Sequence, residues 1–126
     1  MSKEKQILGS KGEELAAGFL KKNGYKILAR NHKTRLGEID IIASDKGTLC
    51  FVEVKTRNSD RFGAPAEAVS GFKQRQISKA ALCYLKEKKF LDKRARFDVV
   101  CVEYQADSPK IHLIKNAFDL DSSYTY

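Results

Sequence analysis

Residues 49–54 are apolar at every position except Glu53, which makes them the most constraining stretch of the chain. A strand with one solvated face alternates apolar and polar side chains, whereas a strand covered on both faces is apolar almost throughout. The stretch therefore predicts a central strand of a sheet that carries other elements over both of its faces. An α/β protein is the expected fold class.

The rest of the chain supplies elements for such a sheet. A first helix is expected to begin at the capping-box spacing of residues 10–13 and to end at Asn23-Gly24, and a longer helix is expected within residues 66–89. Strands are expected at 25–30, 38–43, 48–55, 97–104 and 111–114, with a turn at 44–47 and a loop from 56 to about 65. The predicted order is αβββαββ, a central mixed β-sheet flanked by helices in one domain that spans residues 1–126.

The composition fits a globular chain that needs neither disulfide bonds nor a structural metal ion for stability. Hydrophobic residues make up 42% of the 126 residues and charged residues 32%. The three cysteines lie far apart and form no CxxC pair, which disfavours structural zinc and fits buried thiols in a reducing compartment. No stretch approaches the ~20 apolar residues of a membrane span, and no signal peptide is evident. We therefore expect a cytoplasmic protein.

The chain is basic, with 24 Lys and Arg residues against 16 Asp and Glu residues and a net charge of +8. Such an excess points to a polyanionic partner, with nucleic acid as the first candidate and an anionic membrane surface as the second. Between residues 71 and 96 there are nine basic residues against two acidic ones. A solvated helix face explains that stretch equally well when it is considered alone.

Two carboxylates interrupt the apolar strands of the predicted hairpin. Glu53 and Lys55 point to the same face because side chains alternate along a strand, and Asp40 interrupts the partner strand. If Asp45 pairs with Thr48, Asp40 falls directly opposite Glu53. If residue 43 pairs with Thr48 instead, the two carboxylates are diagonal neighbours on one face.

Facing carboxylates repel one another and cost free energy when half-buried, and a divalent cation removes both problems. Hard oxygen ligands without His or Cys suit Mg²⁺ (or Mn²⁺). The Lys55 ammonium would lie beside an attacking water or a phosphate oxygen and could stabilise negative charge that develops on phosphorus. Asp40, Glu53 and Lys55 therefore form a minimal set for phosphodiester hydrolysis. The alternative is that Glu53 and Lys55 lie at a solvated strand end and pair with each other or with Glu38.

Residues 37–43, with the sequence GEIDIIA, and residues 51–57, with the sequence FVEVKTR, resemble the YraN-like family of uncharacterised bacterial proteins. That family belongs to the PD-(D/E)xK nuclease superfamily, which has the restriction-endonuclease-like fold. The resemblance covers nearly the whole chain and includes residues 12–13 and 96–100. The chain departs from the superfamily motif at Ile39, which stands where the Pro of the Pro-Asp pair would be.

The resemblance implies a Mg²⁺ ion bound by Asp40 and Glu53, with Lys55 as the catalytic lysine. It also implies a further metal-binding and catalytic carboxylate at Glu13, as in the archaeal Holliday-junction resolvases to which the family is similar. Glu13 also has the spacing of a capping-box residue for Ser10, so both roles are open. The resolvase-like relatives further suggest a homodimer.

Candidate nucleic-acid contacts flank the predicted site. Arg57 and Arg61 follow the catalytic strand and could contact phosphates. Lys73, Gln74 and Arg75 lie near the start of the second helix, where the superfamily often places polar residues that assist the site. Ordinary solvated surface is the alternative for both groups.

Three functions are compatible with these residues. The first is a Mg²⁺-dependent endonuclease that hydrolyses DNA, with branched or damaged substrates implied by the resemblance alone. The second is a non-catalytic nucleic-acid-binding module that keeps the fold and the basic face, and the third is an RNA-processing nuclease. Asp98 lies two residues after Arg96, and we interpret the two as a local structural pair outside the site.

Overall fold

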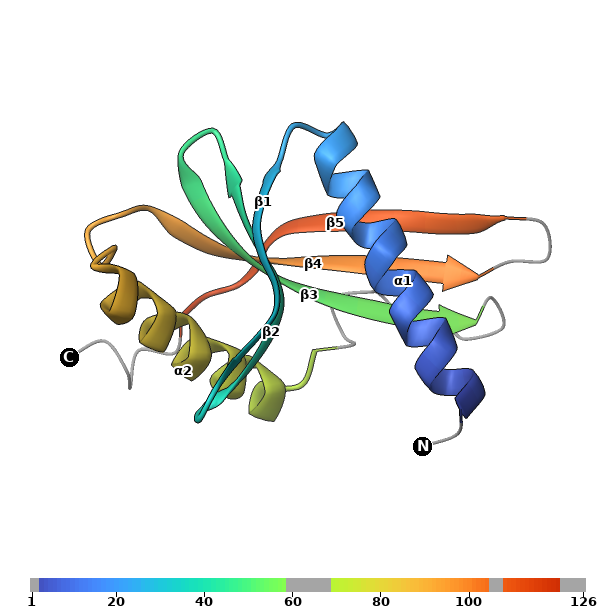
Figure 1. Ribbon diagram of the computed structural model, residues 1–126, viewed down its shortest axis with the longest axis horizontal. Coiled ribbons are helices and arrows are strands. Elements are labelled where there is room, and N and C mark those ends of the chain that lie inside the picture. The colour runs from blue at the N-terminus through green and yellow to red at the C-terminus, as the bar shows by residue number, and fades with distance from the viewer. Residues whose placement is uncertain (1–2, 59–68, 105–107, 121–126) are drawn as a thin grey trace.

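The computed structural model describes residues 3–58, 69–104 and 108–120. Its elements follow the expected order αβββαββ (Figure 1), and they are α1 (Lys3–Lys22), β1 (Lys26–Thr34), β2 (Gly37–Asp45), β3 (Thr48–Asn58), α2 (Gly71–Lys88), β4 (Ala95–Tyr104) and β5 (Pro109–Phe118). Neither described helix is long and apolar enough to cross a membrane.

One mixed sheet contains these strands in the spatial order β1-β2-β3-β4-β5. β3 and β4 are parallel, and the other neighbours are antiparallel. Consecutive parallel strands need a long crossover, and α2 lies in the connection between β3 and β4. The expected α/β class, mixed sheet and element order are confirmed.

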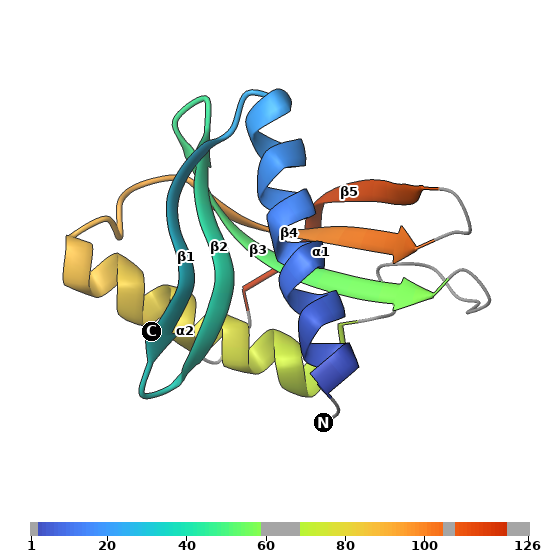
Figure 2. The same cartoon turned by 45° about the vertical axis from the view of Figure 1, so that its right-hand side comes forward.

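β3 is covered on both faces, as its apolar run predicts. Phe51, at 1% exposure, packs with residues of α2, whereas Cys50 and Val52, both fully buried, pack with residues of α1. The two helices therefore cover opposite faces of the sheet, and α1 crosses the strands in both views (Figures 1 and 2). This arrangement confirms β3 as the central strand.

Several element boundaries differ from the prediction, and β1 and β5 each run four residues further than expected, to Thr34 and Phe118. α1 begins at Lys3, so residues 10–13 lie inside the helix and the predicted capping box is wrong. The Lys, Glu and Gln residues before Ser10 are good helix formers, which allows the helix to extend past an internal capping sequence. β3 continues to Asn58, beyond the predicted start of the loop. β5 begins at Pro109, because an edge strand tolerates a residue without an N–H donor.

At Gly12, α1 packs closely against the end of β3. A Cβ atom at this position would collide with the Oγ1 atom of Thr56. A larger residue would require the Thr56 side chain or the helix to shift, so the absence of a side chain permits this approach. The next residue along the helix is Glu13, which is thereby held near the strands that carry the other candidate carboxylates.

Candidate metal-binding site

The hairpin of β2 and β3 has the first of the two predicted registers. Asp45 pairs with Thr48, and the ladder continues to the pair Ile41 and Val52. Beyond that pair the start of β2 and the end of β3 run apart (Figure 1). The Asp40 carboxylate lies at this divergence, where its Oδ2 accepts a hydrogen bond of 2.8 Å from the backbone N–H of Val54.

The alternation of side chains between the two faces of the sheet is interrupted in β2 near Asp40. Ile39 and Ile42 both pack in the cluster beneath α2, whereas Ile41 packs in the cluster beneath α1. Strict alternation would place Ile39 with Ile41 instead. Across from Asp40 on β1 lies Asn31, which has a positive φ of 50°. Both strands are therefore irregular at the position of the predicted site.

Glu53 is the buried centre of the site, with an exposure of only 4%. Its Oε2 atom lies 3.7 Å from the Lys55 Nζ atom and 3.7 Å from the Lys73 Nζ atom. Its Oε1 atom is buried and has no hydrogen-bond partner in the structure. The alternative of a solvated strand end is therefore wrong for Glu53, although its predicted pairing with Lys55 is present.

The charges around Glu53 make its ionised form costly. Burial, followed by hydrogen bonding and charge repulsion from Asp40, raises the pKa of the Glu53 carboxyl to about 8. Lys73 and Lys55 act in the opposite direction and offset only part of that rise. An orphaned buried oxygen beside a second carboxylate fits a hard divalent cation, which would stabilise both ionised groups.

Glu13 approaches the pair from α1. Burial and the charge of Asp40 raise the pKa of the half-buried Glu13, whereas a hydrogen bond from Asn31 and the charge of Arg30 lower it. Because the helix begins well before Ser10, the capping role of Glu13 is excluded and its proximity to Asp40 remains. Across the described residues, no group of three or more His, Cys, Asp and Glu side chains could hold a metal ion. The candidate is thus a two-carboxylate site of the kind in which Mg²⁺ keeps several waters.

The predicted nucleic-acid contacts differ in where they lie. Lys73 reaches the site itself, whereas Gln74 donates from Nε2 to the Val69 carbonyl oxygen at 3.0 Å and Arg75 is exposed. Arg57 lies on β3 with an Nη2 atom 3.4 Å from the Oε1 atom of Glu103. Arg61 lies outside the described residues.

The sequence offered Lys73 as a residue that could assist the site, and the structure brings it there. It did not pair Lys73 with Glu53, because nothing in a linear pattern shows that the first turn of α2 packs beside that carboxylate. It gave no role to Asn31, which meets Glu13 and lies across from Asp40. The available signal was the residue type, because Asn tolerates a positive φ within a strand better than most residues do.

Asp98 and Arg96 form the structural pair that the sequence predicts. The Arg96 Nε atom lies 3.0 Å from Asp98 Oδ1, and its Nη2 atom lies 2.7 Å from Asp45 Oδ2. The Tyr25 hydroxyl and the Asn116 backbone N–H also donate to Asp98, which is fully buried. This network joins β4 to the end of β2 next to the β2–β3 turn. It therefore stabilises the turn end of the hairpin and is not part of the site around Glu53.

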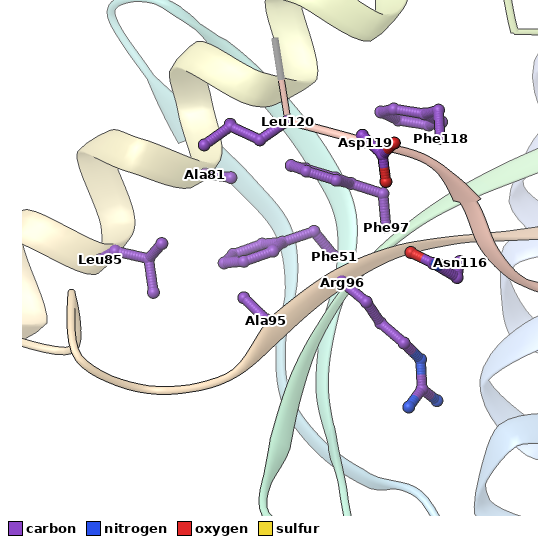
Figure 3. A pocket seen from close by; sticks show the side chains of 10 residues that line it. All are labelled: Phe51, Ala81, Leu85, Ala95, Arg96, Phe97, Asn116, Phe118, Asp119 and Leu120. Atoms are coloured by element: carbon purple, nitrogen blue, oxygen red, sulfur yellow. The ribbon is translucent and has the colours of Figure 1, made fainter. Parts of the chain in front are cut away.

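A small cavity of about 120 Å³ lies near that network, beneath the second half of α2. Figure 3 shows the rings of Phe51, Phe97 and Phe118 around it, while the Arg96 guanidinium points away from the rings. The residues that line it are largely apolar, and none of the candidate site residues is among them. We interpret the cavity as a packing gap of the core.

Replacing Asp40 by Asn is expected to keep the fold and, without metal at pH 8, to stabilise it by up to about 1 kcal/mol. The amide oxygen can still accept the hydrogen bond from Val54, while the repulsion with Glu53 is removed. Thermal melting should also show that Mg²⁺ raises the Tm of the parent and not that of the variant. Asp92→Asn, at an exposed position, is the matched control. Equal responses of the Asp40 variant and the parent to Mg²⁺ would exclude Asp40 as a ligand.

The fold defines an α/β protein with a mixed five-stranded sheet. Residues 12–102 match the Uncharacterised protein family UPF0102, and the chain belongs to this family, which is the YraN-like family that the sequence resembles. A UPF0102 protein of Geobacter metallireducens is 53% identical over 120 residues, which cover 95% of this chain and 98% of the relative. A UPF0102 protein of Geobacter sulfurreducens is 52% identical, with 94% of each chain covered, and one of Desulfosudis oleivorans is 50% identical, with 94% and 95% covered. Because the family is uncharacterised, its name assigns no activity to the chain.

Proposed function

We propose that the chain is a Mg²⁺-dependent endonuclease that hydrolyses DNA phosphodiester bonds, with branched or damaged DNA as its substrate. The observation that carries the proposal is the buried Glu53 carboxylate. Its Oε2 atom lies 3.7 Å from two ammonium groups and its Oε1 atom is buried without a hydrogen-bond partner, while the nearby Asp40 carboxylate disfavours its ionised form. A purely structural carboxylate would be expected to have both oxygens satisfied.

Asp40 and Glu53 would hold the cation, which is Mg²⁺ or Mn²⁺, and Glu13 is the candidate third carboxylate. When bound, the cation would supply positive charge to a phosphate oxygen and acidity to a water. Asp40 is positioned by the Val54 N–H, and Glu53 by its place in the central strand. Groups that are already oriented need little reorganisation when substrate arrives.

The positions of the two lysines suit them to different roles in catalysis. Lys55 is on the same strand as Glu53 and is half-buried, so its ammonium is held close to the place where phosphorus would react. It can orient the attacking water and stabilise the charge that develops in the transition state. Lys73 comes from α2 to the same Glu53 oxygen and is suited to hold a phosphate oxygen of the bound strand.

One observation favours a non-catalytic nucleic-acid-binding module as the second candidate. The Lys55 and Lys73 ammonium groups both lie 3.7 Å from Glu53 Oε2, so they could act on a bound phosphate group without any cation between them. In that case the net charge of +8 would serve binding alone. Such a protein would bind nucleic acid in a salt-sensitive way and cleave none.

A substrate panel tests the proposal and separates it from the alternatives. The full chain is incubated with linear, nicked, flapped and four-way DNA, and with the same structures in RNA, in Mg²⁺, Mn²⁺ or EDTA. We expect cleavage of branched DNA with either cation and none in EDTA. Cleavage of RNA alone would favour the RNA-processing nuclease. Salt-sensitive binding with no cleavage of any substrate would contradict the proposal and favour the module.

A further inference from the structure

A groove runs beside the candidate site, between the β1–β2 turn and the first half of α2. Lys33, Arg35, Leu36 and Glu38 line it from the hairpin, and Lys73 and Gln76 line it from the helix, around a volume of about 430 Å³. In both views the hairpin lies alongside α2 (Figures 1 and 2). A Cβ at Gly37 would lie only 2.9 Å from the Gln76 carbonyl oxygen, so the two walls are in close contact at that point.

The groove is basic and continuous with the site. Lys33 and Arg35 are exposed, and Lys73 contributes a third positive charge against the single carboxylate of Glu38. The Lys73 ammonium that lines the groove also lies 3.7 Å from Glu53 Oε2. A polyanion that follows the groove would therefore be led to the candidate carboxylate pair.

An aromatic ring lies next to this basic groove. Phe72 is 63% exposed, the largest exposed fraction among the large hydrophobic residues that the structure describes. It precedes Lys73 and stands four residues before Gln76, so Phe72 and Gln76 share one side of the helix. Leu36, at 45% exposure, is a second exposed apolar side chain and lines the groove from the hairpin side.

We infer that this groove binds a single strand of DNA, with its phosphates along Lys33, Arg35 and Lys73 and an unpaired base stacked on Phe72. A basic groove combined with an aromatic platform is the usual composition of single-strand sites. In a duplex, both faces of each internal base are already stacked, so an exposed ring gains a partner only where bases are unpaired. The inference rests on the proposed function and adds that the site acts on substrates with unpaired nucleotides beside the cleaved bond.

Fluorescence anisotropy of the full chain in EDTA tests this inference, with a labelled oligo(dT) strand and a duplex of equal length as probes. Phe72→Ala should weaken binding of oligo(dT) by about 5- to 160-fold and binding of the duplex by less than about 2-fold. Phe72→Tyr should restore single-strand binding because it keeps the ring. A Lys33→Ala and Arg35→Ala double variant should lower the slope of log affinity against log salt by about 1.4 for the single strand.

Leu91→Ala is the matched control, because Leu91 is 59% exposed and lies outside the residues that line the groove. It should bind both probes as the parent does. Parental binding of oligo(dT) by Phe72→Ala, or equal losses on both probes, would overturn the inference. Binding is measured without metal and cleavage with it, so the two proposals can fail separately. A parent that cleaves no substrate but needs Phe72 for single strands would contradict the nuclease alone.

Discussion

Lys55→Ala is expected to lower the Mg²⁺-dependent cleavage rate by about 10²- to 10³-fold, with the fold retained. Removing one pre-oriented group that stabilises developing charge in a transition state costs about 2.7–4 kcal/mol of activation free energy. The Lys55 side chain is half-buried, so solvent replaces its charge poorly in the variant. Single-turnover cleavage of the best substrate in the panel, at saturating Mg²⁺, measures the chemical step directly.

Two further variants show whether the loss of activity in Lys55→Ala is specific to that residue. Lys73→Ala removes the other ammonium at the same Glu53 oxygen, and it should weaken substrate binding more than it slows chemistry at saturating substrate. Lys86→Ala removes an exposed charge from the last turn of α2 and should do neither. Thermal melting shows that each variant is folded. Parental cleavage by Lys55→Ala would remove this residue from the mechanism.

The central part of the fold was predictable because its signals are local. An apolar run in residues 49–54 requires a strand that is covered on both faces, and the turn length then limits the register of the hairpin to a few choices. Asp40 and Glu53 were selected as charged interruptions in apolar strands, and the observed register brings them to the same point. The placement of Lys55 on the same face as Glu53 was predicted from the two-residue period of side chains along a strand.

The remaining site features depend on contacts between residues that are distant in the sequence. The approach of Lys73 to Glu53 depends on how the crossover helix packs on the sheet, which helical periodicity does not specify. The capping spacing at residues 10–13 was a local signal that the preceding helix-forming residues overrode. The break in alternation between Ile39 and Ile42 arises where β2 leaves β3, and strand patterns assume that no such break occurs.

Raising the pH from about 5 to about 8 is expected to destabilise the metal-free protein, relative to Glu53→Gln, by about 3–4 kcal/mol. The pKa of Glu53 rises from an ordinary value of 4.5 to about 8 in the folded protein, first through burial and then through Asp40. Below pH 4.5 both the folded and the unfolded chain carry this proton. Between pH 4.5 and 8 the unfolded chain loses it while the folded chain retains it, so the free energy of unfolding falls as the pH rises.

The glutamine variant separates this effect from all other titrations, because it keeps the shape of Glu53 and carries no titratable proton. Urea unfolding of both proteins in EDTA across the pH range gives the difference directly. A saturating cation should restore the stability of the parent at pH 8 more than that of the variant, because only the parent offers two carboxylates. Parallel pH profiles for the two proteins would mean that Glu53 ionises at an ordinary pH. The buried carboxylate pair would then lack the electrostatic cost that makes a divalent cation its natural partner.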